Sequence, residues 1–503
     1  MTLIYESTVE QELEKLCSIL PTKILEESCD EVVKIFGPNI IAGLDAKLGP
    51  DKVCGDLRLC TGDCKLFKKP ISSAVFGTRP AEYPFTPAMI DAKLAALGWN
   101  PFQWLIDLIN KFANQHEPLV DLDGDFFSPD PGFRGAHWRG RDCVDDDKTI
   151  YPGRKTSTHG ASVDHDCNGV SGINAQGQSY EDVLCAGTPR QGTIVVGDSV
   201  GAHFEIPPQW LNASTVSRDA LSDVVSRAED EFDLPYRGFT TGYVQSSQEV
   251  PVNSLYEYTL AANRCNFRDF QNMGVNGERS GSATKLVNSI GRKVDTDHPA
   301  LVVFELVGND ICHPAHSLDS ITSPEEFKKN LLESLAEFDT YLPAGSHMLF
   351  LNLADGRILY NALKDATHPI GVPYPDFYDY LNCLELSPCW AWMNSNETVR
   401  NGAAAKMDVL NQVSADIVAQ ASYKNFDMHL IDFATMMQEV STQGIPMRDL
   451  IEPVDGFHPN QRANSLIGQY LFANLTATAP HFLAPTNPNN ANITALFGDQ
   501  GGY

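Results

Sequence analysis

Five short apolar runs that alternate with helical stretches constrain the second half of this chain more than any other feature. The runs lie at 193–196, 267–272, 300–307, 347–353 and 426–432, and the stretches with helical periodicity at 283–292, 324–342, 398–422 and 460–475. Ser323-Pro-Glu-Glu326 is a capping box with proline at the first helical position, so a helix begins there. Strands that alternate with helices form a parallel sheet with helices on both faces. The sequence therefore predicts a three-layer α/β/α domain over residues 188–480.

The first apolar run ends in Gly-Asp-Ser, which gives Ser199 a chemically useful position. Ile194, Val195 and Val196 form the β-branched run typical of a strand buried on both faces. The carboxyl end of such a strand is where open α/β sheets bind their ligands. A serine hydroxyl is a weak nucleophile unless a base takes its proton, and His458 offers that base. A strand-to-helix turn can also use the same residue types only for the turn and the helix cap, so the motif alone leaves both interpretations open.

Two further segments add residues with hydrolase chemistry. Gly277 precedes a helical stretch, and Asn309 follows the apolar run that ends at Val307. Serine, glycine, asparagine and histidine in this order, with Asp455 three residues before His458, resemble the GDSL or SGNH hydrolases. Because Val307 stands where that family has the first glycine of Gly-x-Asn-Asp, we expect a different turn before the asparagine.

The resemblance implies a flavodoxin-like fold and a role for each of these blocks. It makes Ser199 the nucleophile, His458 the base and Asp455 the carboxylate that orients the base. It builds the oxyanion hole from the backbone amides of Ser199 and Gly277 and the side chain of Asn309.

Three groups of aspartate and asparagine residues lie between residues 119 and 187, in a segment with neither helical nor strand periodicity. They are Asp121, Asp123 and Asp125; Asp142, Asp145 and Asp147; and Asp164, Asp166 and Asn168. Carboxylates repel one another unless a cation lies between them, and calcium prefers oxygen ligands of this kind. The pattern therefore predicts a calcium-binding segment that a Cys143–Cys167 disulfide closes. Zinc is disfavoured because the nearby histidines lack regular ligand spacing, and a solvated acidic loop is the alternative.

The first 64 residues carry helical periodicity over 8–20 and 30–48, which indicates two amphipathic helices. A small helical bundle would satisfy that pattern. Cys17 and Cys29, followed by Cys54 and Cys60, also resemble the later part of a saposin B domain without its first helix, which leaves Cys54 and Cys60 without their usual partners. The resemblance implies a disulfide-linked helical segment that binds lipids and presents them to hydrolases.

The other segments connect or end these parts. Residues 65–118 are predicted to be a linker with one helix, and Cys64 is expected to pair with Cys383 or Cys389. From 481 to 503, prolines and asparagines indicate an extended strap over the surface.

Charge and cysteine content limit the partners and the compartment. A formal net charge of −28 argues against nucleic acid, whose protein partners usually present a basic face. The 12 cysteines indicate disulfides and an oxidising compartment. The same compartment is consistent with Asn-x-Ser/Thr sequons at Asn212, Asn396, Asn474 and Asn492.

The apolar runs of the chain are short. The cysteines and sequons imply a secreted or lysosomal/vesicular protein. Because residues 1–10 lack the apolar core of a signal peptide, we expect the chain to begin inside a longer precursor. No run reaches the roughly 18 apolar residues of a transmembrane helix, so we expect only peripheral contact with a membrane or micelle, through the saposin-like segment.

Together, the saposin-like segment, the acidic segment and the hydrolase blocks resemble the acyloxyacyl hydrolase family. The similarity extends to residues 134–143, 198–204, 451–460 and 497–502. It implies hydrolysis of the secondary, acyloxy-linked fatty acids of lipopolysaccharide lipid A, with other acylated lipids as further partners. A phospholipase or carbohydrate esterase with the same triad is the alternative among enzymes, and a non-catalytic lipid-binding protein is the alternative outside them. Hydrolysis of a short-chain nitrophenyl ester would exclude the last.

Overall fold

The structure of this chain is a computed structural model. It describes residues 30, 33–34, 64–66, 116–155, 160–210, 223–243, 250–312, 315–442 and 444–503. The predictions that lie outside the described residues are the helix at 8–20, most of the helix at 30–48, most of the linker with its helix at 65–118, the pairing of Cys17, Cys29, Cys54 and Cys60, and the sequon at Asn212.

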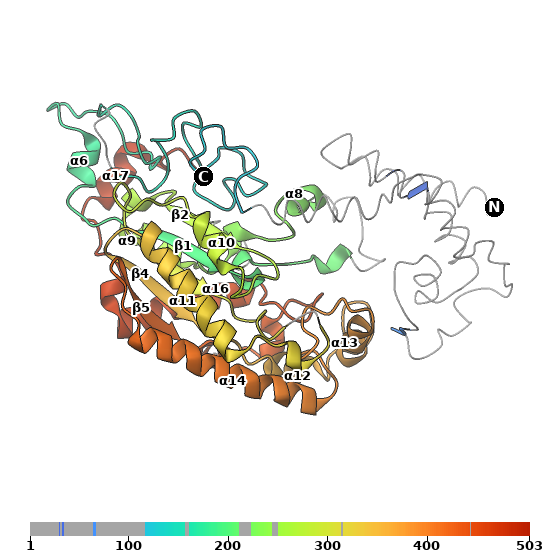
Figure 1. Cartoon of the computed structure of the whole chain (residues 1–503). Helices are drawn as coiled ribbons and strands as arrows, with labels where there is room; N and C mark the ends of the chain where they lie inside the picture. Colours follow the sequence, from blue (N-terminus) through green and yellow to red (C-terminus); the bar gives the residue numbers. More distant parts are fainter. Residues whose placement is uncertain are drawn as a thin grey trace, which may run out of the picture.

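A parallel sheet of five strands forms the centre of the described fold (Figure 1). Its strands are β1 (Gly192–Gly197), β2 (Phe270–Gly274), β3 (Ala300–Glu305), β4 (Ser346–Leu351) and β5 (Phe426–Ile431). They lie in the order β2-β1-β3-β4-β5, and every neighbouring pair is parallel. This is the flavodoxin-like order, in which ligands bind where the connections diverge between β1 and β3. The five strands predicted from the apolar runs are confirmed.

Helices cover both faces of this sheet, as the alternation predicted. The main helices are α9 (Leu255–Ala262), α10 (Ala283–Asn288), α11 (Pro324–Tyr341), α14 (Glu397–Gln420), α15 (Phe433–Thr442) and α16 (Gln461–Thr478). Successive residues of β1 point into different cores, because side chains alternate along a strand. Ile194 packs into the core that contains Leu335 of α11, whereas Val195 packs into the core that contains Leu471 of α16. The α/β/α fold class is confirmed.

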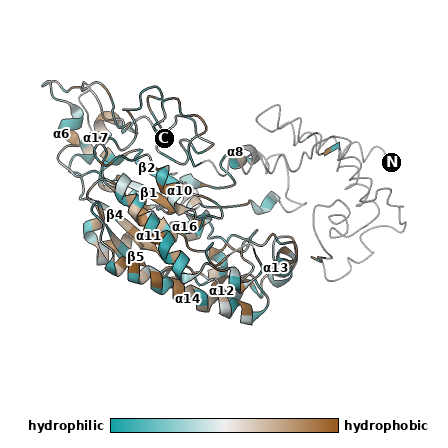
Figure 2. Ribbon diagram, in the orientation of Figure 1, coloured by the Kyte–Doolittle hydropathy of each residue, from teal (hydrophilic) through white to brown (hydrophobic). Residues whose placement is uncertain are grey.

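The helix α11 forms for the local reasons visible in its sequence. Ser323 Oγ accepts a hydrogen bond from the Glu326 amide at 3.2 Å, and Pro324 occupies the first turn. Leu331, Leu335 and Phe338 are buried, each with at most 1% of its surface exposed. Figure 2 shows that α11 and α14 carry both hydrophilic and hydrophobic residues, as helices that cover one face of a sheet must.

Shorter helices complete the described part of the chain. They are α6 (Tyr180–Leu184), α7 (Ser199–Ala202), α8 (Val224–Glu229), α12 (Arg357–Leu363), α13 (Tyr374–Cys383) and α17 (Asn490–Phe497). Within the described residues there are also 3-10 turns at Pro208–Trp210, Pro235–Arg237, Arg264–Asn266, Leu318–Ser320, Met447–Leu450 and Pro480–Phe482.

The extended conformation predicted for the C-terminal tail is wrong where the tail forms a 3-10 turn and α17. Ile493 of α17 is fully buried beside Val170 and the Cys185–Cys265 disulfide. Asn487, ahead of α17, donates to the backbone oxygen of Leu184 at 2.9 Å. The tail folds because Ile493 packs against an apolar surface formed by residues far away in sequence. The composition of the tail alone does not reveal that surface.

The irregular acidic segment continues the sheet at its β2 edge. Arg139 and Gln271 form an antiparallel bridge, the Asn272 amide donates to Trp138 O at 2.6 Å, and the Gly140 amide donates to Phe270 O at 2.9 Å. The segment therefore satisfies backbone groups that an open edge would leave unpaired.

Disulfides tie the segments together. The predicted Cys143–Cys167 bond is confirmed, and Cys64 pairs with Cys383, one of its two predicted partners. The other bonds among the described cysteines join Cys185 to Cys265 and Cys312 to Cys389. In the part of the chain that the structure describes, no helix is long and apolar enough to cross a membrane.

Candidate active site

The candidate nucleophile lies at the carboxyl end of β1. Ser199 is the first residue of α7, and only 7% of it is exposed. Its Oγ lies 2.7 Å from Nε2 of His458, although 259 positions separate the two residues in sequence. Because Ser199 opens a helix, its own backbone amide has no acceptor within that helix. The serine thus combines a hydroxyl beside a base with an amide directed away from the helix.

The imidazole of His458 is held by Asp455. His458 Nδ1 lies 2.5 Å from Asp455 Oδ2, and Asp455 Oδ1 accepts from the amides of Phe457 at 2.7 Å and His458 at 3.1 Å. Since an ionised carboxylate only accepts hydrogen bonds, Nδ1 must carry the proton and Nε2 is left as the acceptor that faces Ser199. This is the tautomer that a general base requires.

Two aromatic rings enclose the imidazole. The ring of Phe204 lies 4.9 Å from that of His458, and the ring of Phe457 lies 4.8 Å away, edge to face. These contacts restrict rotation of the base about its own side-chain bonds.

Asn309 lies beside the nucleophile, at the carboxyl end of β3. It lines the same cavity as Ser199, and its Nδ2 donates to Asp198 Oδ2 at 3.3 Å. Asp198 Oδ1 in turn accepts from the Val200 amide at 2.9 Å. Burial raises the pKa of Asp198 to about 6, although backbone hydrogen bonds and the nearby His458 oppose the rise. Asp198 therefore connects the serine turn to the amide group that would face an oxyanion.

Gly277 lies apart from this group. It is on an exposed turn after β2, with a φ of +82° that favours glycine. Gly277 is absent from the described residues that line the cavity beside Ser199. The structure thus brings Ser199, Asn309, Asp455 and His458 together, whereas Gly277, three residues after β2, does not line their cavity.

The cavity beside Ser199 is almost entirely apolar. Its wall comes from α7, α12 and α15 and from the loops that carry the candidate catalytic residues. The apolar lining residues include Val307, Ile358, Leu359, Trp392, Phe433, Met437 and Leu450. Such a lining favours a hydrocarbon chain over a sugar or another polar group.

The predicted calcium ligands divide into two groups in the structure. Ligand atoms of Asp121, Asp123 and Asp125 lie within 4.8 Å of one another. Both carboxylate oxygens of Asp123, and Oδ2 of Asp125 and of Asp142, are buried and have no hydrogen-bond partner among the described residues. Asp145 adjoins them, because its Oδ1 accepts from the Leu122 amide at 3.2 Å.

The electrostatics of this first group fit a bound cation. Burial raises the pKa of Asp125 to about 8 and that of Asp142 to about 6, and neighbouring carboxylates add to both rises. Burial and the nearby Asp121 raise the pKa of Asp123 as well. Buried, unpartnered carboxylate oxygens that repel one another form the donor set of a hard cation such as calcium.

The other predicted ligands already have partners. Asp147 Oδ1 accepts from the Thr149 amide at 3.1 Å, and Asp164 accepts from the amides of Asn168 at 3.1 Å and Gly169 at 2.8 Å. Asp166 pairs with Arg190.

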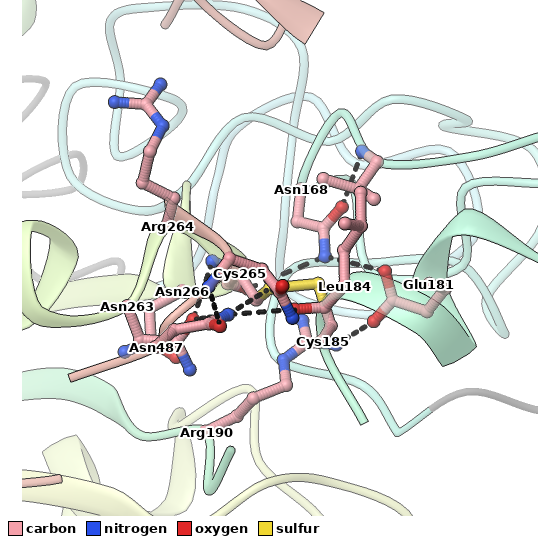
Figure 3. The surroundings of a disulfide bond; sticks show 12 residues. Asn168, Glu181, Leu184, Cys185, Arg190, Asn263, Arg264, Cys265, Asn266 and Asn487 are labelled. Atoms are coloured by element: carbon pink, nitrogen blue, oxygen red, sulfur yellow. Dashed lines mark hydrogen bonds and ion pairs between the residues drawn. A yellow bond between two sulfur atoms is a disulfide. The ribbon is translucent and has the colours of Figure 1, made fainter. Parts of the chain in front are cut away.

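Asn168 lies in this second group. Its Nδ2 donates to Glu181 Oε2 at 3.2 Å, and Figure 3 shows the two side chains beside the Cys185–Cys265 disulfide, with Arg190 nearby. Arg190 donates to Glu181 at 2.5 Å and so supplies the positive charge that an acidic cluster needs. Asp166, Glu181 and Arg190 thus form an ion-pair network beside Asn168, which spacing in the sequence could not distinguish from a cation site.

Known proteins resemble both the hydrolase part and the N-terminal part of the chain. Residues 194–471 match the GDSL-like lipase/acylhydrolase family, and residues 1–85 match the saposin-like domain. Over 99% of its length and 90% of theirs, the chain is 36% identical to acyloxyacyl hydrolase of Oryctolagus cuniculus and 35% identical to those of Mus musculus and Homo sapiens. Over 55 residues, which are 11% of this chain and 67% of the relative, it is 36% identical to saposin-C of Cavia porcellus. Ser199, His458 and Asp455 are in hydrogen-bond contact beside the end of β1, as a serine hydrolase requires. Together with these similarities, this shows that the chain belongs to the acyloxyacyl hydrolases of the GDSL-like lipase/acylhydrolase family.

Proposed function

We propose that this carboxylic ester hydrolase removes secondary, acyloxy-linked fatty acyl chains from lipopolysaccharide lipid A. The observation that carries the proposal is the contact of 2.7 Å between Ser199 Oγ and His458 Nε2 at the wall of an apolar cavity. The triad supplies ester hydrolysis, and the cavity supplies a preference for the acyl part of the substrate.

The geometry supports a two-step acyl transfer. His458 Nε2 takes the proton of Ser199 while Oγ attacks the ester carbonyl, and His458 then gives that proton to the departing hydroxyl of the substrate. A water molecule, activated by the same nitrogen, releases the fatty acid from Ser199. Asp455 keeps Nδ1 protonated throughout and stabilises the imidazolium that forms.

Negative charge on the carbonyl oxygen needs donors that are already in place. The Ser199 amide and Asn309 Nδ2 are the donors that we assign from this cavity, and the Gly277 amide is assigned from the family pattern. Donors of this kind stabilise the transition state more than the substrate, because the charge develops only there.

Calcium is part of the proposal. Asp121, Asp123, Asp125 and Asp142 would hold the ion, since their oxygens are clustered and several are buried without partners. Bound there, the ion would neutralise the repulsion between carboxylates and fix the loop. None of these residues belongs to the triad, so its expected contribution is to stability.

The N-terminal segment would act in delivery of the substrate. Saposin-like domains bind lipids, and we propose that residues 1–85 make peripheral contact with micelles or membranes and present lipid to Ser199. The disulfides of the described part support a secreted or lysosomal location.

Mass analysis of the products from purified lipopolysaccharide tests the proposed reaction. We expect free fatty acids and lipid A that has lost only its secondary acyl chains, and no release by Ser199→Ala. A phospholipase would instead release acyl chains from glycerophospholipids while leaving lipid A intact. A carbohydrate esterase would release acetate from acetylated glycans, and a non-catalytic lipid-binding protein would release nothing.

A further inference from the structure

A buried glutamate lies directly beneath the turn that carries Ser199. Glu305 is the last residue of β3, has 0% of its surface exposed and pairs in register with Gly197 of β1. Its Oε1 accepts hydrogen bonds from the amides of Asp198 at 3.0 Å and Gly201 at 2.7 Å. A side chain at Gly197 or Gly201 would collide with this carboxyl group, which explains glycine at both ends of Gly-Asp-Ser-x-Gly.

A second buried glutamate has the same relationship to the turn that carries Asp455 and His458. Glu452 is 1% exposed, and its Oε2 accepts from the amides of Val454 and Asp455, each at 2.8 Å. Its backbone amide also donates to the carbonyl oxygen of His458 at 2.8 Å. One carboxyl oxygen and one amide of Glu452 therefore hold both ends of this turn.

We propose that Glu305 and Glu452 are positioning residues for the triad, each fixing one catalytic turn through two backbone amides. The inference rests on the proposed ester hydrolysis by Ser199 and adds residues that touch neither the substrate nor the reacting atoms. Without these acceptors, two buried amides in each turn would lose their hydrogen bonds, and the turns would move to find other partners. A displacement of about 1 Å in a catalytic group can cost on the order of 100-fold in rate.

The role rests on the backbone hydrogen bonds that each carboxyl oxygen accepts, and a neutral oxygen can accept them as well. Burial and the neighbouring Asp198 carboxylate raise the pKa of Glu305 well above its usual value. Burial, followed by the Asp455 carboxylate, raises the pKa of Glu452 to about 9. Both shifts favour the protonated acid, and glutamine keeps an acceptor oxygen at the same place without a charge.

Steady-state kinetics of matched variants test the proposal on a short-chain nitrophenyl ester. Glu305→Gln and Glu452→Gln keep an oxygen acceptor, whereas Glu305→Met and Glu452→Met keep the volume and remove the acceptor. We expect kcat per folded molecule within about 3-fold of wild type for the glutamine variants. For the methionine variants we expect kcat to fall by about 100-fold while KM changes less than about 3-fold.

Asp297 provides a control for buried acceptors in general. It is 0% exposed, lies ahead of β3 at the opposite end of that strand, and accepts from the Lys293 amide and the Tyr151 hydroxyl, both at 2.8 Å. Asp297→Ala should lower the melting temperature and leave kcat per folded molecule within about 2-fold of wild type.

The outcomes separate this inference from the proposed function. Folded methionine variants with wild-type kcat would overturn the positioning role, as would glutamine variants that lose as much activity as the methionine variants. If a methionine variant does not fold, the alanine variant at the same position replaces it under the same criterion. A wild-type protein no more active than Ser199→Ala would instead overturn the proposed hydrolysis.

Discussion

Asn309 Nδ2 donates a hydrogen bond of 3.3 Å to Asp198 Oδ2. Asp198, which precedes the nucleophile Ser199, therefore holds Asn309, the residue that would bind the oxyanion. Asp198 and Asn309 follow β1 and β3, which are neighbours in the sheet although 111 positions separate the two residues. The serine turn and the asparagine are thus fixed relative to each other before substrate binds.

We therefore expect Asn309→Ala to lower kcat by roughly 10²–10³-fold on any ester, because one oxyanion donor is typically worth that much. KM should change little, since the lost bond forms fully only in the transition state. Asn425→Ala is the control, because Asn425 is a buried asparagine that precedes β5 at an edge of the sheet, away from the cavity beside Ser199. Equal loss of kcat in both variants would contradict the role of Asn309.

The three triad side chains should differ in how much kcat falls when each is removed. Ser199→Ala and His458→Ala should each lower kcat by about 10⁴–10⁶-fold with an unchanged melting temperature, and Asp455→Ala should be about 10–100-fold less damaging. The aspartate orients the base without taking its proton, so some activity survives its loss. Burst and steady-state kinetics on a nitrophenyl ester measure these values, and substantial turnover by His458→Ala would refute the mechanism.

The apolar cavity should set the preference for acyl-chain length. Ile358 of α12 lines it, so Ile358→Trp should fill space that a long chain needs. We expect kcat/KM for a long-chain ester to fall at least about 10-fold while hydrolysis of an acetyl ester stays within about 2-fold. Val409→Trp, at a residue 50% exposed on α14, should change neither activity. A parallel loss on both esters in Ile358→Trp would indicate that the cavity does not hold the acyl chain.

Calcium should raise the stability of the fold. An ion that binds only the folded state at a hundredfold excess over its Kd stabilises by about 2.7 kcal/mol. Chelation should therefore lower the melting temperature, and calcium should restore it better than magnesium, whose octahedral preference suits a crowded carboxylate loop poorly. Asp123→Asn should abolish the effect of calcium, because both oxygens of Asp123 lack other partners among the described residues. An unchanged melting temperature after chelation, with no metal by elemental analysis, would reject the calcium site.

His203 should destabilise the protein in acid. It is 1% exposed, and burial, with Arg237 and Arg227 nearby, lowers its pKa to about 3. The unfolded chain binds the proton below pH 6.5 and the folded chain does not, so stability falls as the pH drops through this window. The contribution between pH 7 and pH 5 is about 2 kcal/mol.

Denaturant unfolding at several pH values tests this effect. His203→Asn should lose the corresponding part of the pH dependence between pH 7 and pH 5. His481→Asn should retain it, because the side chain of His481 is 63% exposed. Identical pH profiles for wild type and His203→Asn would contradict the prediction.

The sequence by itself determined those strands and turns whose residue patterns are local. The strands β1, β3 and β4 are visible as largely apolar runs, because a strand buried on both faces carries mostly apolar side chains, whereas β2 and β5 also contain polar residues. Ser199 at the end of the first run, and Asp455 three residues before His458, were identifiable because turn chemistry and short spacing are local properties. The family pattern supplied the link between blocks that local chemistry cannot connect.

Only the tertiary structure decided which distant groups meet. Glu305 was present in an otherwise apolar run, which was a visible signal, but only the pairing of β1 with β3 shows which amides it binds. Asp123 and Asp166 each stand at the centre of an Asp-x-Asp-x-Asp/Asn pattern, yet one has unpartnered oxygens among the described residues and the other pairs with Arg190. Cys64 likewise meets Cys383 across 319 positions. Periodicity in the sequence indicates whether a side chain is buried. Which residue it contacts depends on how distant elements pack together, and the local sequence does not contain that information.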